Sequence, residues 1–137
     1  MILGKCKVFR EKIYATHTGD KQMNLFPQRC VRDHRYKYLL NLRPERVWTT
    51  HFTKVDGIPN SHKDIWDSWR QKAATDPSAA RLLDLIDHHP PEELYDTWSD
   101  PYELSNLAGR ADLKPVLEAM RHDLKLWMTA QGDAGDK

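Results

Sequence analysis

Cysteine is scarce in this chain of 137 residues, and long apolar runs are missing. Cys6 and Cys30 are too few for a disulfide framework and lack metal-site spacing, so we interpret them as two ordinary, partly buried thiols. No run approaches the ~18 apolar residues that a membrane-spanning helix needs, which predicts no membrane partner. The opening Met1–Lys5 is too short and too soon charged to predict a signal peptide.

An excess of charge of one sign is also missing. The 21 basic and 20 acidic side chains give a formal net charge of +1. This balance provides no overall attraction to polyanions, so we predict no nucleic-acid partner. The charges are unevenly placed, because residues 28–46 are rich in Arg and Lys whereas residues 84–103 are mainly acidic.

The composition is that of one folded domain over residues 1–137. Hydrophobic residues make up 39% of the chain and charged residues 30%. Five Trp, five Tyr and three Phe supply enough apolar area for a core.

Alternating and turn patterns predict a small sheet. Asp33-His34 separates two alternating runs at hairpin spacing. We expect strands over 11–18, 28–32, 35–42 and 93–96.

Helices are expected in two places. Residues 43–91 predict an irregular loop followed by a helical-hairpin insertion, whose helices begin at Ser61 and at Asp76-Pro77. The strongest helical pattern covers 112–130, with Arg121, His122 and Lys125 predicted to face away from the core. Residues 131–137 read as a flexible tail. The fold class is therefore α+β, a small antiparallel sheet packed against a C-terminal helix, with one helical insertion.

The patterns of catalytic sites are not found. No Gly-x-Ser-x-Gly or glycine-rich phosphate loop occurs, and the seven histidines lack the spacing of metal ligands. We therefore predict no catalytic residue and no metal site in this chain.

Two blocks carry a resemblance to a known family. Residues 26–42 read FPQRCVRDHRYKYLLNL, and residues 93–108 contain ELYD followed by DPYELSNLA. These blocks, in this order, resemble the C-terminal subdomain of formylglycine-dependent sulfatases of the heparan N-sulfatase and arylsulfatase type. We expect Asp100-Pro101 in the second block to cap one helical turn ending near Gly109.

The resemblance implies a parent enzyme, typically exported, that hydrolyses sulfate esters or sulfamates with a formylglycine and a bound calcium ion. The formylglycine is made in a Cys/Ser-x-Pro/Ala-x-Arg motif. Cys6 and Arg10 have the spacing, but Val8 stands where Pro or Ala is required and Phe9 is large. We therefore expect no cofactor in this chain, and we expect a missing catalytic domain to hold both groups.

The resemblance also implies that the subdomain lends residues to a substrate cleft. We predict that His17, Asn24 and Arg29 contact a sulfated small molecule or glycan. Arg29 has a second interpretation, a salt bridge to the missing domain.

Two functions follow. The first is a C-terminal fragment of a sulfatase, inactive alone, with an apolar patch where the catalytic domain would pack. The alternative is a stand-alone module that binds sulfated glycans through Arg29 and Arg32 without catalysis.

Overall fold

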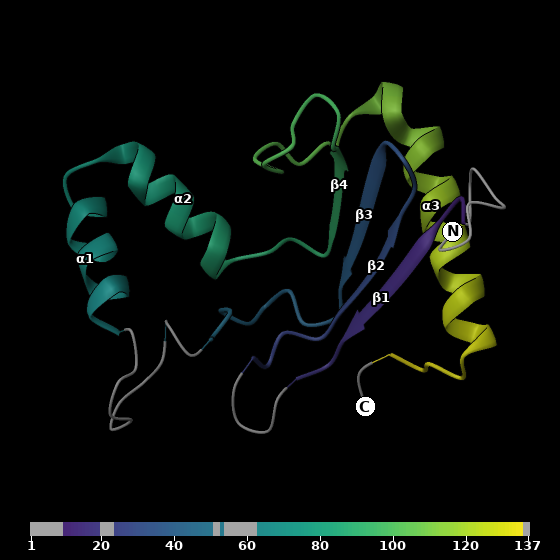
Figure 1. Ribbon diagram of the computed structural model, residues 1–137, viewed down its shortest axis with the longest axis horizontal. Coiled ribbons are helices and arrows are strands. Elements are labelled where there is room, and N and C mark those ends of the chain that lie inside the picture. Colours follow the sequence, from purple (N-terminus) through teal and green to yellow (C-terminus); the bar gives the residue numbers. More distant parts are fainter. Residues whose placement is uncertain (1–9, 20–23, 51–52, 54–62, 136–137) are drawn as a thin grey trace, which may run out of the picture. The chain divides into compact units, whose positions relative to one another are not determined.

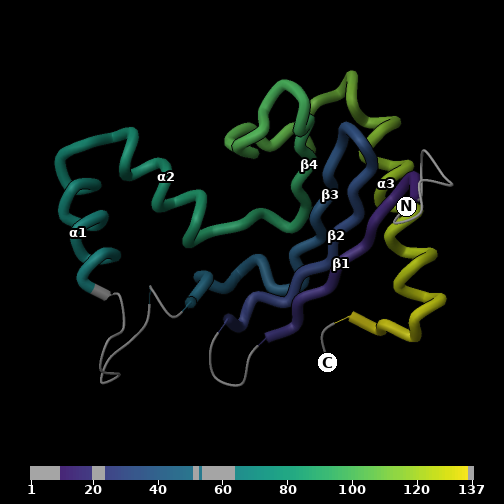
Figure 2. The backbone as a smooth tube through the Cα atoms, viewed as in Figure 1, coloured from purple at the N-terminus to yellow at the C-terminus, as the bar shows by residue number. Residues whose placement is uncertain are grey.

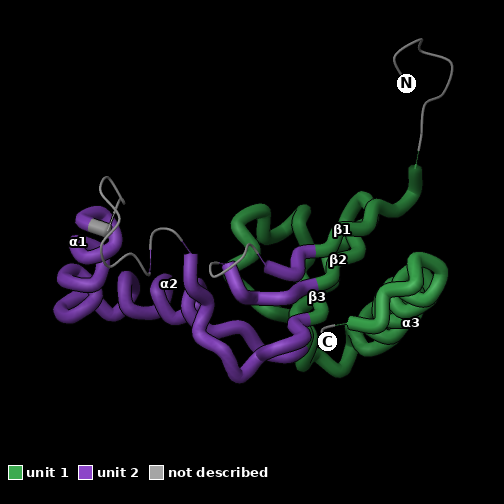
Figure 3. The backbone as a smooth tube through the Cα atoms, turned by 90° about the horizontal axis from the view of Figure 1, so that it is seen from below, with its two compact units in different colours: residues 1–16, 29–40, 92–137 green, residues 17–28, 41–91 purple. Residues whose placement is uncertain are grey.

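The computed structural model describes residues 10–19, 24–50, 53 and 63–135 (Figure 1). Its contacts divide the chain into two units, shown in different colours in Figure 3. Unit 1 comprises residues 1–16, 29–40 and 92–137, and unit 2 comprises residues 17–28 and 41–91.

The predicted α+β class is confirmed by one four-stranded sheet. Its strands follow one another in the order β1-β2-β3-β4, and β3 pairs antiparallel with β4, with Tyr38 opposite Leu94 (Figure 1). The strand bounds lie within about two residues of those expected: β1 Ile13–His17, β2 Gln28–Arg32, β3 Tyr36–Asn41 and β4 Glu92–Asp96.

The predicted β2–β3 hairpin is closed by an aspartate turn. The Asp33 carboxylate accepts hydrogen bonds from the backbone N–H groups of Arg35, at 2.7 Å, and Tyr36, at 2.6 Å. A short side chain that bonds to the backbone two and three residues on stabilises a tight turn without the usual Asn-Gly pair.

The core of unit 1 lies between the sheet and α3 (Lys114–Ala130), which follows the 3₁₀ turn η1 (Ala111–Leu113). The tube in Figure 2 follows α3 alongside the strands of this unit. Tyr14 on β1 stacks on Trp127 with ring centroids 5.1 Å apart. The buried side chains of this core are Val31, Tyr38, Leu94, Leu117, Met120 and Leu124.

One expectation about α3 is corrected. Arg121 does not face away, because its guanidinium donates to the Glu92 carboxylate at 2.6 and 2.7 Å. The segment predicted as a flexible tail begins with hydrogen bonds to the end of α3. The N–H of Gly132 donates to the Thr129 carbonyl and that of Asp133 to the Met128 carbonyl, which is a Schellman cap with Gly132 at φ +68°.

In unit 2, α1 (Lys63–Ala73) packs against α2 (Pro77–Asp87). The predicted cap of α2 is confirmed, since the Asp76 carboxylate accepts from the N–H groups of Ser78 and Ala79 and Pro77 opens the helix. Ser61, the predicted cap of α1, lies outside the described residues.

The expected helical turn at Asp100-Pro101 is wrong. Glu103 has a left-handed backbone (φ +56°), and the Asp100 carboxylate accepts from the N–H of Ser105, too far along the chain for a helix cap. No helix among the described residues combines the length and apolarity needed to cross a membrane.

Candidate functional site

His17 and Asn24, two of the predicted substrate contacts, meet in unit 2. The Nε2 of His17 lies 2.9 Å from the backbone carbonyl oxygen of Asn24. A carbonyl only accepts, so Nε2 carries the proton in this arrangement. Asn24 is in the left-handed region at φ +53°, and its N–H donates to the carbonyl of Thr49. An asparagine tolerates this conformation better than most residues, which suits it to the sharp bend.

The imidazole of His17 is one end of a continuous aromatic stack. Its centroid lies 4.5 Å from that of Phe26, which lies 4.0 Å from Trp48, which in turn lies 3.6 Å from His89. The N–H of Trp48 also donates to the carbonyl of Asp87, at 2.8 Å, tying the stack to the end of α2. The stack was not predicted, because its members come from four separate stretches of sequence.

Arg29 lies in the other unit and is engaged within this chain. Its side chain is 3% exposed, and its guanidinium donates to both carboxylate oxygens of Asp133, at 2.5 and 3.0 Å. Hydrogen bonding from Arg29 lowers the pKa of Asp133. Arg29 therefore forms its salt bridge with the Schellman cap of α3. The second interpretation of Arg29 assigned that salt bridge to the missing domain instead.

A second polar network joins β4 to α3. Glu92 accepts from Arg121 and from the hydroxyl of Tyr38, which is at 2.5 Å. The pKa of Glu92 is lowered mainly by the bond from Arg121, whereas burial and Glu92 raise the pKa of Tyr38. Both shifts stabilise the protonation states already present near neutral pH, so this network suits structure better than proton transfer.

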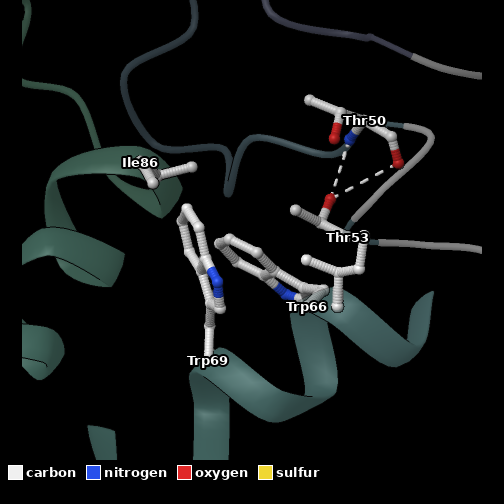
Figure 4. A pocket seen from close by; sticks show the side chains of 6 residues that line it. Thr50, Thr53, Trp66, Trp69 and Ile86 are labelled. Carbon is white, nitrogen blue, oxygen red and sulfur yellow. Dashed lines mark hydrogen bonds between the residues drawn. The ribbon is translucent and has the colours of Figure 1, made fainter. Parts of the chain in front are cut away.

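A pocket of about 370 Å³ lies in unit 2 beside α1 (Figure 4). The indoles of Trp66 and Trp69 lie next to each other. Nearby, the backbone N–H of Thr50 donates a hydrogen bond to the hydroxyl of Thr53. Trp66 is 5% exposed, and its Nε1 has no hydrogen-bond partner among the residues that the structure describes. The described lining is mainly apolar and therefore suits apolar contact: Thr50, Thr53, Ile65, Trp66, Trp69 and Ile86.

Comparison with known proteins identifies the wider context. No family model matches the chain. The chain is 33% identical over 135 residues to an ulvan-active sulfatase of Formosa agariphila, and this alignment covers 97% of the chain. A second ulvan-active sulfatase of the same organism is 36% identical over 105 residues, or 77% of this chain. The resemblance to the sulfatase family is thereby confirmed. The aligned part is 24% of the first relative's length and 17% of the second's.

The described part of this chain does not fit the cofactors that the sulfatase resemblance implies. No three His, Cys, Asp or Glu residues within it are grouped so as to hold a metal ion. Cys30 lies on β2, where burial raises the pKa of its thiol, so it is a poor nucleophile near neutral pH. Cys6 lies outside the described residues.

Proposed function

We propose that this chain is the C-terminal part of a sulfatase that hydrolyses sulfate esters or sulfamates of a sulfated carbohydrate. It contributes packing and part of the substrate cleft, and it is inactive alone. The proposal rests on the share of each protein that the alignment covers. Similarity to a sulfatase extends over 97% of the chain, yet the chain corresponds to only 24% of that relative.

In this proposal, the groups that carry out the hydrolysis lie in the remaining part of the enzyme. Calcium and formylglycine belong there, because the described residues offer no metal-binding group and Cys6-Lys7-Val8-Phe9-Arg10 departs from the formylglycine motif. Whatever this chain contributes is then binding or positioning, and a bound substrate gains rate from groups that orient it.

The contribution to the cleft is assigned first to the bend that carries His17 and Asn24. The stack on Phe26 and the bond to the Asn24 carbonyl fix the plane of the imidazole, so a substrate contact there would cost little side-chain entropy. Arg29 could take part only by exchanging Asp133 for a substrate anion. We therefore expect His17 to matter more than Arg29 for substrate binding.

A chimera tests the proposal. This chain replaces the aligned 135 residues of the first Formosa agariphila relative, and sulfate release from ulvan is measured for the chimera and for the isolated chain. We expect release from the chimera and none from the isolated chain. In the chimera, His17→Ala should raise KM about tenfold with a smaller change in kcat, since it removes binding shared by ground and transition states.

His122→Ala is the matched control, because His122 is exposed on α3 in unit 1 and should leave KM unchanged. Sulfate release by the isolated chain would contradict the proposal. So would a soluble, folded chimera that binds calcium and carries formylglycine but releases no sulfate.

A further inference from the structure

The loop after β4 presents an indole to solvent in a fixed position. Trp98 is 65% exposed, the most of any tryptophan among the large exposed apolar residues. Its Nε1 nevertheless donates to the carbonyl of His34 at 2.7 Å, and its backbone N–H donates to the Asp96 carboxylate at 3.2 Å. The His34 ring makes an edge contact at 5.5 Å. An exposed indole held in one orientation is well suited to binding, because it offers a large apolar surface and loses little side-chain entropy on contact.

One face of this indole is already used. The guanidinium carbon of Arg35 lies 5.6 Å from the Trp98 centroid and 4.9 Å from that of Tyr36. Arg35 is itself paired with Asp96 at 2.7 Å, so its charge is compensated and its position is fixed. Trp98 is nevertheless 65% exposed, so much of the indole is still open to solvent.

A second cation lies beside the loop. Arg32, at the end of β2, is exposed, and its Nη2 lies 3.4 Å from the hydroxyl of Thr97, the neighbour of Trp98. Among the described residues, Arg32 hydrogen-bonds to that hydroxyl and pairs with no carboxylate. Arg32 thus differs from Arg35, and its guanidinium is available to bind an anion in two-pronged fashion.

We propose that Trp98 and Arg32 form a surface site for an anionic saccharide. The apolar C–H face of a sugar ring would stack on the exposed part of the indole, whose π-electrons attract weakly positive hydrogens. A sulfate or carboxylate on the sugar would pair with Arg32. Because the ring is held before binding, little rotamer entropy is lost on contact.

The site suits a saccharide better than a single-stranded nucleic acid. Strand-binding surfaces combine several aromatic rings with a basic groove. Here one indole lies with one uncompensated arginine, and two carboxylates, Asp33 and Asp96, are within the same turn region. The site concerns the isolated chain, so it holds or fails independently of the cleft proposed above.

Titration of the 137-residue chain tests the site. The probes are oligosaccharides of dextran sulfate, polygalacturonate and uncharged dextran, with oligothymidylate as the nucleic-acid probe. We expect dextran sulfate or polygalacturonate to bind, and their ratio identifies sulfate or carboxylate as the preferred anion. Trp98→Ala should weaken binding about tenfold, and Trp98→Tyr should weaken it less because stacking is retained. Arg32→Ala should weaken binding and reduce its dependence on salt.

Two matched variants serve as controls. Trp69→Ala removes a half-exposed indole from α1, and Arg110→Ala removes an exposed arginine already paired with Asp112. Both should bind like the original chain, with unchanged circular dichroism in all variants. The proposal is overturned if no charged saccharide binds, if dextran or oligothymidylate binds equally well, or if Trp69→Ala is as damaging as Trp98→Ala.

Discussion

Two ion pairs of unit 1 join residues far apart in the chain. Arg29 on β2, which is buried, pairs with Asp133 beyond α3, and Glu92 on β4, which is partly exposed, pairs with Arg121 on α3. A charge taken out of water destabilises the fold unless such a partner compensates it. These two ion pairs therefore connect strands of unit 1 to α3 and to the segment that follows it.

Asp133→Asn tests the more buried of these pairs. It removes the negative charge that Asp133 places beside the Arg29 guanidinium, which is 3% exposed, and we expect the free energy of unfolding to fall by about 2–3 kcal/mol. Urea denaturation measures the change. Arg32→Ala, an exposed residue on the same strand, should change stability by no more than about 0.5 kcal/mol. Equal effects of the two variants would show that the Arg29 pair carries no special weight.

Asp96 provides a prediction about pH. The bond from Arg35 is the main cause that lowers the pKa of Asp96 from 3.8 to about 2. A carboxylate with a depressed pKa in the folded state stabilises the fold above its unfolded pKa and loses that effect as pH falls through the folded one. We therefore expect the contribution of Asp96 to stability to disappear between pH 3.8 and about 2.

Carbon-13 NMR titration of the carboxyl groups checks this directly. Arg35→Gln should move the pKa of Asp96 upward, towards 3.8. The pKa of Asp76 is lowered by Lys72 and by the backbone amides of the α2 cap, so it should stay unchanged in the same spectra. If the pKa of Asp96 stays the same in Arg35→Gln, Arg35 is not the main cause of its low value.

At the scale of elements, the end of α3 decides where Asp133 lies. Gly132 has φ +68°, a conformation that side chains with a Cβ rarely adopt. Gly132→Ala should therefore cost about 1 kcal/mol of unfolding free energy. Gly109→Ala is the control, because Gly109 is not in that region and an added Cβ would meet nothing within 4 Å. Thermal unfolding of both variants measures the difference, and equal melting temperatures would contradict the Schellman assignment.

Elements with local signals were predictable from the sequence. The Asp76-Pro77 start of α2 and the β2–β3 hairpin rely on contacts between residues two or three apart. The Asp100-Pro101 turn has the same local signal, but Asn106 overrides it. Its side chain accepts from the N–H of Leu94 and donates to the carbonyl of Glu92, which fastens the loop to β4 in a non-helical path.

The candidate site was less predictable for the same reason. His17 and Asn24 are near neighbours in sequence, and their juxtaposition follows from one bend. The stack that continues to Trp48 and His89, and the Arg29–Asp133 pair, join residues too distant for any spacing rule to relate. What periodicity does predict is the apolar face of α3, because the spacing that creates it is a property of the helix itself.

At the scale of the whole molecule, the fold depends on that face meeting the sheet. Leu124 is fully buried, whereas Leu126, two residues later on α3, is 57% exposed. Leu124→Ala should lower the free energy of unfolding by about 2–5 kcal/mol, since it leaves a cavity against Val31 and Tyr38 of the same core. Leu126→Ala should cost about 0.5 kcal/mol or less.

Hydrogen exchange adds a spatial test, because only Leu124→Ala should speed exchange of the amides of β2 and β3, which are separated from α3 by more than 70 residues. Similar losses for the two leucines would mean that α3 does not pack on the sheet through this face.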